Sequence, residues 1–308
     1  MNHLGELISL LVAVSWTFSA WFADKASRRI GSMVTNVIRL ALAAILLALL
    51  LWITTGYPYP AFANAKAWQW LALSALVGYV FGDFCLFNCY ISIGPRFGQL
   101  LMTLAPPAAA VAGYFILGES ITWKTCLAMA VTLGGIAISI LSRGQDHHVK
   151  LSLPLKGILL GIGAGVGQGV GLVLSKVGME HYAETAPAEL QTMLPFASTM
   201  IRAIVGFAGF FIIITLQKGL GRLGSGIRDG RGMKYATLLT LFGPVFGVSL
   251  SLMAVRYADA GIASTLMALT PVMIILPDIL INKKKITLRE IVGIAVTMLG
   301  VSLFFLYQ

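Results

Sequence analysis

The chain has 308 residues, of which 58% are hydrophobic and only 11% are charged, and its mean hydropathy is +0.87. A soluble domain of this length needs far more polar surface, so the composition excludes a soluble globular protein and favours an integral membrane protein. The formal net charge of +10 does not indicate a nucleic-acid-binding protein, because Lys and Arg lie mainly in the short connections between apolar stretches.

Ten apolar stretches, each about 20 residues long and therefore able to cross a membrane as a helix, follow one another along the chain. The first has no basic segment before it, so we expect it to be an anchor rather than a removable signal peptide. The period-2 alternation of a membrane β-barrel is absent from the sequence. The sequence therefore predicts an all-α membrane protein with ten transmembrane helices, near 4–23, 34–54, 68–90, 97–117, 122–142, 155–175, 195–216, 235–256, 261–281 and 288–307.

A repeat relates the two halves of the chain. A shift of 165 residues aligns Gly78–Ile136 with Gly243–Val301 without a gap, and it pairs Pro106 with Pro271. We expect two five-helix halves, 1–145 and 150–308. Because each half has an odd number of spans, the second must enter the membrane in the opposite sense. Inverted repeats of this kind are typical of secondary transporters, whose substrate site lies near the midplane between the halves.

Charged side chains inside the spans mark candidate functional positions, because burying them in a membrane is costly. Asp83 lies in the middle of a predicted helix, with Asn88 five residues later, and is either a substrate or proton site or a packed, paired carboxyl. Asp278 lies close to the lysine run 283–285, so an interfacial or paired role is favoured. If one carboxyl couples transport to protons, we expect Asp83, because it lies farther from the interface.

Two arginines occupy comparable positions in the second span of each half. Arg39 and Arg202 lie one to two turns inside their predicted helices. They either extend to the membrane surface or act as paired gates or anion contacts.

The sixth span contains two ladders of glycines spaced four apart, 157, 161, 165, 169 and 163, 167, 171, which allow close helix packing. Gln168 is the polar side chain among them, and we expect it to face a cavity. No strand precedes the glycines, so a nucleotide-binding loop is excluded. Neither the three cysteines nor His147 and His148 form a convincing metal site, and we expect no cofactor.

Both halves resemble the EamA domain of the drug/metabolite transporter superfamily. The resemblance is carried by the proline of each fourth helix and by Gly118-Glu119 before "SIT". The second helix of each half also has an Ile-Arg pair, which ends at Arg39 and Arg202. The first-helix pattern of the family, Trp-Gly followed by a lysine about eight residues later, is present in altered form as Trp16…Lys25 and Gln168-Gly169…Lys176. The second half departs at the Gly-Glu pair, where Lys283 and Lys284 stand. The resemblance implies transport of small metabolites such as amino acids, with both termini cytoplasmic.

The membrane orientation stays open. Sixteen of the 20 Lys and Arg outside the spans lie in odd-numbered connections, which predicts both termini outside, in conflict with the family. An intramembrane aspartyl protease is an alternative function, although Val80 replaces the first glycine of its Gly-x-Gly-Asp motif. A channel is the other alternative.

The sequence thus predicts a secondary transporter that exports its substrate across a bacterial inner membrane. Its partners are expected to be a small-molecule substrate, protons and membrane lipid, and the chain a monomer or weak homodimer. The substrate pathway is predicted to include Trp16, Arg39, Asp83, Asn88, Gln99, Thr103, Gln168, Arg202 and Asp278.

Overall fold

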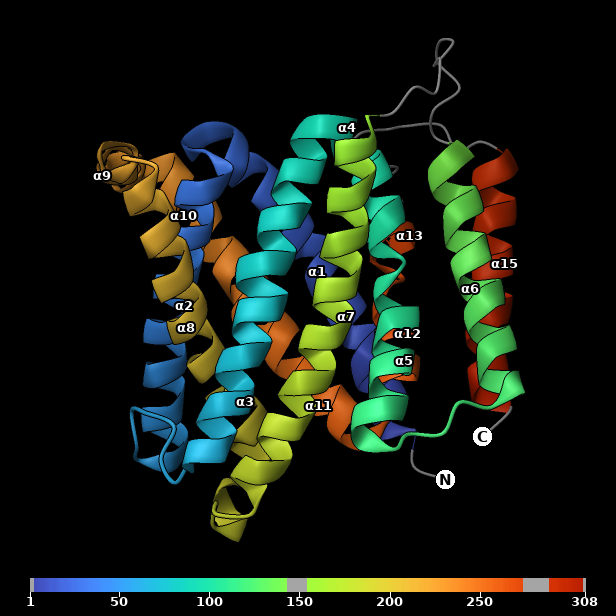
Figure 1. Ribbon diagram of the computed structural model, residues 1–308, viewed down its shortest axis with the longest axis horizontal. Coiled ribbons are helices and arrows are strands. Elements are labelled where there is room, and N and C mark those ends of the chain that lie inside the picture. Colours follow the sequence, from blue (N-terminus) through green and yellow to red (C-terminus); the bar gives the residue numbers. More distant parts are fainter. Residues whose placement is uncertain (1–2, 143–153, 274–287, 307–308) are drawn as a thin grey trace. The chain divides into compact units, whose positions relative to one another are not determined.

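The structure is a computed structural model that describes residues 3–142, 154–273 and 288–306. Every regular element within these ranges is a helix, which agrees with the all-α prediction (Figure 1). Seven runs of the described residues are long and apolar enough to cross a membrane: Leu4–Ile30, Ser32–Thr55, Ala65–Leu86, Leu100–Leu117, Leu155–Ala183, Ala188–Leu216 and Gly230–Tyr257. The apolar parts of two further helices, Trp123–Ile138 and Ile291–Leu303, are shorter. The chain is therefore an integral membrane protein, and seven of the ten predicted spans meet this criterion.

The helices of the first half are α1 (Leu4–Ile30), α2 (Ser32–Thr55), α3 (Ala65–Ala75), the π-helix η1 (Leu76–Asp83), α4 (Phe84–Met102), α5 (Ala105–Leu117) and α6 (Trp123–Ser142). Those of the second half are α7 (Leu155–Ala183), the 3-10 helix η2 (Ala188–Met193), α8 (Leu194–Leu216), α9 (Leu220–Arg228), α10 (Gly230–Thr240), the π-helix η3 (Leu241–Val248), α11 (Ser249–Tyr257), α12 (Ala260–Met267), α13 (Thr270–Met273) and α15 (Leu288–Leu306).

Several predicted boundaries were wrong. The first helix continues past residue 23 to Ile30, because Arg28 and Arg29 in its last turn interact favourably with the negative end of the helix dipole. The third begins earlier than 68, at Ala65, where the Asn64 side chain accepts a hydrogen bond from the Ala67 backbone N–H and caps the helix.

The fourth predicted helix, 97–117, is two elements rather than one. α4 ends at Met102 and α5 begins at Ala105, with prolines in its first turn. Proline lacks the N–H that an uninterrupted helix needs, so the prolines at 106 and 107 favour a new helix start at this point.

The same elements recur 165 residues apart in the two halves. α3 begins at Ala65 and α10 at Gly230, while the two π-helices begin at Leu76 and Leu241. The break in the fourth helix also recurs, because α13 begins at Thr270, 165 residues after the start of α5. The offset found in the sequence therefore locates the main interruptions of both halves.

The described chain forms two compact units that differ from the two halves. The first compact unit contains residues 1–14, 81–170 and 254–308, and the second contains 15–80 and 171–253. The core of the first unit includes Ala13, Ile136, Leu266 and Val301. The core of the second is larger and is built mainly by α2 and α8. Each unit therefore draws helices from both halves.

α6 and α15 pack side by side in the first compact unit (Figure 1). The contact is reciprocal: a Cβ at Gly135 would meet Thr297, and a Cβ at Gly300 would meet Thr132. Because Thr132 is matched with the later glycine and Gly135 with the earlier threonine, the helices run antiparallel. Small residues at both crossings let the two backbones approach closely.

The glycines of α7 have the packing role that their spacing predicted. In the first compact unit, a Cβ at Gly165 would lie 2.8 Å from the Leu101 carbonyl oxygen, and one at Gly169 would meet the α5 backbone. Gly163, on the second ladder, lies against Phe81 and Cys85. α7 therefore contacts α4 and α5 at backbone distance.

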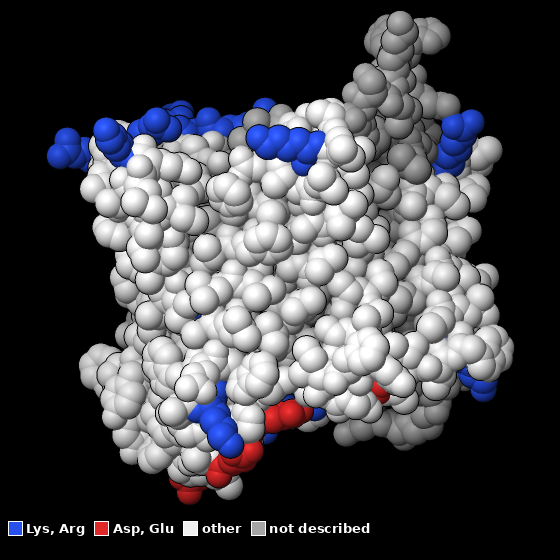
Figure 2. Space-filling view, viewed as in Figure 1, with Lys and Arg blue, Asp and Glu red and all other residues white. Residues whose placement is uncertain are grey.

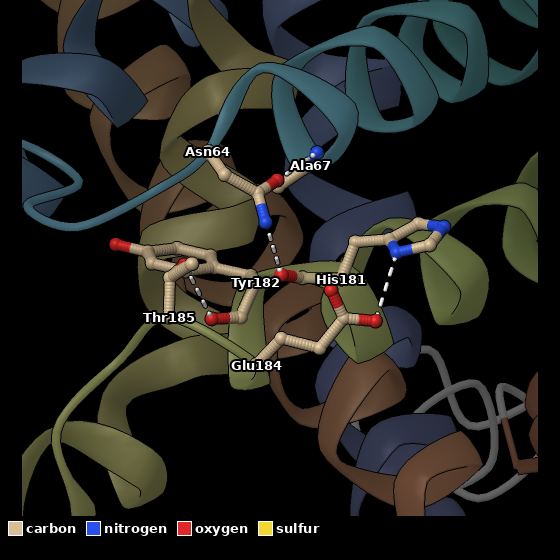
Figure 3. A network of polar contacts seen from close by, with 6 residues as sticks. All are labelled: Asn64, Ala67, His181, Tyr182, Glu184 and Thr185. Carbon is tan, nitrogen blue, oxygen red and sulfur yellow. Dashed lines mark hydrogen bonds and ion pairs between the residues drawn. The ribbon is translucent and has the colours of Figure 1, made fainter.

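A network of polar contacts in the second compact unit fixes the end of α7 to the α2–α3 connection (Figure 3). The Asn64 side-chain amide donates to the His181 carbonyl oxygen at 2.8 Å, while its oxygen caps α3. The buried Tyr182 hydroxyl donates to the Ala61 carbonyl oxygen at 2.7 Å, and the Thr185 hydroxyl donates to that of Phe62 at 2.6 Å. This connection is therefore held by side chains rather than by regular structure.

Candidate functional site

Asp83 is the last residue of η1 and is only 6% exposed. Its side chain makes no capping bond at the start of α4. Instead, its Oδ1 accepts a hydrogen bond of 2.8 Å from the Gln168 side-chain amide of α7, within the first compact unit. Sequence reasoning proposed both residues separately, and the structure brings them together as one buried polar pair.

Both third helices change to π geometry where they approach the first helix of the other half. A π-helix pairs residues five apart and is rare, and in many proteins it marks a functional position. Glycine recurs in both segments, which read LVGYVFGD in η1 and LFGPVFGV in η3. Within the second compact unit, a Cβ at Gly171 of α7 would lie 2.8 Å from the Gly78 Cα atom, so the two backbones almost touch. The π segments are therefore packing sites for α7 and α1.

Trp16 of α1 lies against η3 in the second compact unit. A Cβ at Gly247 would come 2.6 Å from the indole Nε1, so glycine is needed for the ring to fit. Phe242 lies one turn before Gly247 in η3. The Ser15 hydroxyl donates to its carbonyl oxygen at 2.7 Å, and the ring centroids of Phe18 and Phe242 are 5.2 Å apart. The 165-residue offset matches Asp83 with Val248, so the second half has no carboxyl at the position where Asp83 pairs with Gln168 in the first.

Arg202 is buried, with 4% of its surface exposed, in the middle of α8. The central carbon of its guanidinium lies 4.5 Å from the centroid of the Tyr79 ring, a cation–π arrangement within the second compact unit. The interpretation that Arg202 extends to the surface is therefore wrong for this conformation. The ring and the alkyl stem shield a positive charge inside the span.

Arg39 differs from Arg202 although the sequence matches them. Arg39 is half-buried in α2, and its backbone carbonyl oxygen accepts a bond from the Thr240 hydroxyl at 3.4 Å. Arg39 is therefore less buried than Arg202, and a role of the two arginines as paired gates stays a prediction.

Asn88 and Thr103 satisfy their side chains within their own helix. The Asn88 amide donates to the Phe84 carbonyl oxygen at 2.8 Å, and the Thr103 hydroxyl donates to that of Leu100 at 2.6 Å. Neither bond joins them to the Asp83–Gln168 pair. Gln99 lies in α4, but its side chain is outside the described residues, and so is the whole of Asp278.

Tyr79 is the residue that sequence reasoning missed. It is 5% exposed and lies four positions before Asp83 in η1. Two features of the sequence could have indicated Tyr79: it has both a ring and a hydroxyl, and it lies in the glycine-rich segment that ends at the intramembrane Asp83. Its contact with Arg202 depends on tertiary packing, which these features alone do not reveal.

The described part of the chain contains no group of three His, Cys, Asp or Glu side chains arranged to hold a metal ion. Cys85 and Cys89 are buried and unbonded to one another, and Cys126 is exposed. The polar contacts described at these positions are the hydrogen bond between Gln168 and Asp83 and the cation–π contact between Arg202 and Tyr79.

Comparison with solved structures shows the fold. One structure, titled only "Crystal structure of protein", superposes with a TM-score of 0.72 at 14% sequence identity. The alignment covers 100% of this chain and 98% of that one. No curated protein matches the sequence significantly.

Comparison with protein families finds the same family in both halves of the chain. The EamA-like transporter family matches residues 3–141 and again residues 155–306, and so covers most of the chain as two copies. The membrane-spanning helices, the repeated elements and this double match agree with one another. The chain belongs to the EamA-like transporter family.

Proposed function

We propose that the protein is a secondary transporter that carries a small metabolite with both an amino and an acidic group, such as an amino acid, in exchange for protons. The proposal rests chiefly on the Asp83–Gln168 pair. A carboxyl that is 6% exposed inside a span is costly to keep charged, and such residues commonly serve proton relays and substrate pathways. The amide of Gln168 can donate to Asp83 in either protonation state, so the pair can persist while the carboxyl gains or loses a proton.

Arg202 supports an acidic group on the substrate. Its guanidinium carries a permanent positive charge and lies 4.5 Å from the centroid of the Tyr79 ring. An arginine guanidinium can bind a carboxylate through two parallel hydrogen bonds. Asp83 then serves as the proton-binding group, and Arg202 serves as the group that selects an anion.

The reciprocal contact of α6 and α15 supports alternating access between two inverted halves, 1–145 and 150–308. These helices end the two halves, and they cross antiparallel through matching Gly and Thr pairs. Such a contact is what a two-fold axis perpendicular to the helices produces. We propose export across a bacterial inner membrane by a monomer or weak homodimer.

The test is transport by the purified full chain in liposomes, scanned across amino acids, amines and organic acids. A carrier shows counterflow, in which unlabelled substrate inside drives uptake of labelled substrate, because each binding site is exposed alternately. We expect counterflow with amino acids and acidification-driven accumulation with the same substrates. Conduction without counterflow would identify a channel instead, and hydrolysis of a peptide without transport would identify a protease.

A further inference from the structure

α9 is a short amphipathic helix between two candidate spans. It has nine residues and connects two candidate spans, Ala188–Leu216 and Gly230–Tyr257, with only a few residues on either side. Its sequence, LGRLGSGIR, places apolar and basic residues on different faces, and Leu220 and Ile227 are 47% and 54% exposed. Leu223 packs against the core of the second compact unit. A short amphipathic helix with exposed apolar residues beside spans is typical of the lipid interface.

A hollow of about 760 Å³ lies beside this helix in the second compact unit. Arginines line it from three elements: Arg29 at the end of α1, Arg228 at the end of α9 and Arg231 at the start of α10. Gly221, Gly224 and Gly230 also line the hollow. The space beside each of them is open, because a Cβ added there would meet no atom within 4 Å. Figure 2 shows the corresponding gathering of Lys and Arg side chains at the upper left, where Figure 1 labels α9.

Asp229 is the carboxylate in this hollow, and its hydrogen bonds are already used. Its Oδ1 accepts from the Arg29 Nε at 2.7 Å and from the backbone N–H groups of Arg231 and Gly232. These bonds hold the Arg29 side chain and the start of α10 in place. They do not neutralise the positive charges of Arg228 and Arg231. Within the described chain, the guanidinium groups of Arg228 and Arg231 form no ion pair, and both residues are exposed. The hollow therefore has a local excess of positive charge.

We propose that the hollow beside α9 binds the phosphate of an anionic phospholipid headgroup, with Arg228 and Arg231 as its principal ligands. Arginine forks match phosphate oxygens in geometry as well as charge. A soluble phosphate fits the charge equally well, but the exposed Leu220 and Ile227 give α9 an apolar surface suited to acyl chains, which favours a lipid headgroup. Basic hollows at the ends of transmembrane helices are known to recognise lipid headgroups.

The experiment is native mass spectrometry of the detergent-purified full chain, titrated with phosphatidylglycerol or with zwitterionic phosphatidylethanolamine. We expect one phosphatidylglycerol to be retained in preference. The test variant is Arg228→Gln with Arg231→Gln, and the matched control is Arg222→Gln, because Arg222 is exposed on the same helix but does not line the hollow. Loss of two charges should weaken phosphatidylglycerol retention roughly thirty-fold, or about five-fold for each charge.

Three outcomes would overturn the proposal. Equal retention of the two lipids by the wild-type chain would overturn it. This measurement needs no variant, so it remains decisive even if the double variant fails to fold. A loss of about five-fold in Arg222→Gln, equal per charge to the loss in the double variant, would show general surface charge rather than a site. Displacement of phosphatidylglycerol by millimolar inorganic phosphate or glycerol phosphate would identify a soluble phosphate as the ligand. A loss confined to the double variant, with no displacement by soluble phosphate, supports a lipid site.

Discussion

The Gln168 amide of α7 donates a hydrogen bond to the Asp83 carboxyl at the end of η1, with 2.8 Å between nitrogen and oxygen. The bond joins the first helix of one half to the third helix of the other, at the residue where π geometry returns to α. A change in the charge of Asp83 therefore acts at a contact between two helices.

Asp83→Asn tests the coupling role. Asparagine keeps the size of the side chain and an oxygen that can accept from Gln168, but it cannot bind a transported proton. We expect accumulation driven by a pH gradient to be abolished while counterflow persists, both measured in liposomes. Asn88→Ala is the comparison variant, since the Asn88 amide bonds to the Phe84 carbonyl oxygen of its own helix rather than to Asp83, and we expect it to keep pH-driven accumulation. Unchanged pH-driven transport in Asp83→Asn would make Asp83 a packing residue.

Arg202→Lys separates charge from shape. Lysine keeps the positive charge but loses the guanidinium that lies 4.5 Å from the Tyr79 ring centroid and can bind a carboxylate through two hydrogen bonds, so we expect KM for an amino acid to rise about five- to thirty-fold. The corresponding amine without the carboxylate should be affected less. Tyr79→Phe retains the ring and should stay near wild type. An equal loss for amino acid and amine would argue against anion recognition by Arg202.

Gly165→Ala tests the close approach of α7. The added Cβ would lie 2.8 Å from the Leu101 carbonyl oxygen, a backbone atom, so a helix must shift. We expect destabilisation of about 1–3 kcal/mol, read as a lower thermal midpoint in detergent. At Gly134 of α6 a Cβ meets nothing within 4 Å. Gly134→Ala should therefore be neutral or stabilising, by up to about 1 kcal/mol from helix propensity. Equal effects at both positions would contradict the packing assignment.

The Asn64 network predicts a graded loss of stability. Asn64→Asp keeps the acceptor that caps α3 but removes the donor to the His181 carbonyl oxygen, whereas Asn64→Ala removes both. We expect a cost of about 1 kcal/mol for the first change and a further 0.5–2 kcal/mol for the second, from thermal melts in detergent. A melt of Asn64→Asp as low as that of Asn64→Ala would mean that the cap contributes nothing.

Asp229 gives a pH dependence outside the spans. The hydrogen bond from Arg29, followed by that from the Gly232 N–H, lowers the pKa of this carboxyl below its ordinary value of 3.8. A carboxyl with a lowered folded pKa stabilises the fold fully above the unfolded value, and this contribution is lost as pH falls through the folded value. The melting difference between wild type and Asp229→Asn should therefore be constant from about pH 7 to pH 5 and shrink below pH 3.8. A difference that widens in acid would contradict this sign.

The sequence predicted the repeat well, because proline, glycine and apolar runs recur at one spacing. The same spacing relates the two helix breaks, at Thr103 and Leu104 in the first half and 165 residues later in the second, but the sequence predicted one continuous helix across each of them, 97–117 and 261–281. The π-helices were not predictable. They leave no change in the hydrophobic period of the sequence, and the close helix contacts at Gly78 and Gly247 that accompany them are seen only in the folded structure.

Site residues were predictable as types but not as partners. An intramembrane carboxyl and a lone glutamine among glycines stand out in the sequence, so Asp83 and Gln168 were found. Asn88 stands out equally, yet its amide bonds to the carbonyl oxygen four residues earlier, the nearest acceptor in any helix. A polar residue in a span can bond to a neighbouring helix, as Gln168 does, or within its own helix, as Asn88 does. The result depends on which side chains the neighbouring helix presents, and this is determined by tertiary packing.

The crossing of α6 and α15 carries a consequence for how such a chain can arise. Thr297 and Gly300 on one helix are the counterparts of Thr132 and Gly135 on the other, and each glycine receives the opposite threonine. A single half therefore carries both members of the contact. Two copies of one half, inserted in opposite directions, would already recognise each other, and fusing them into one chain requires no new surface.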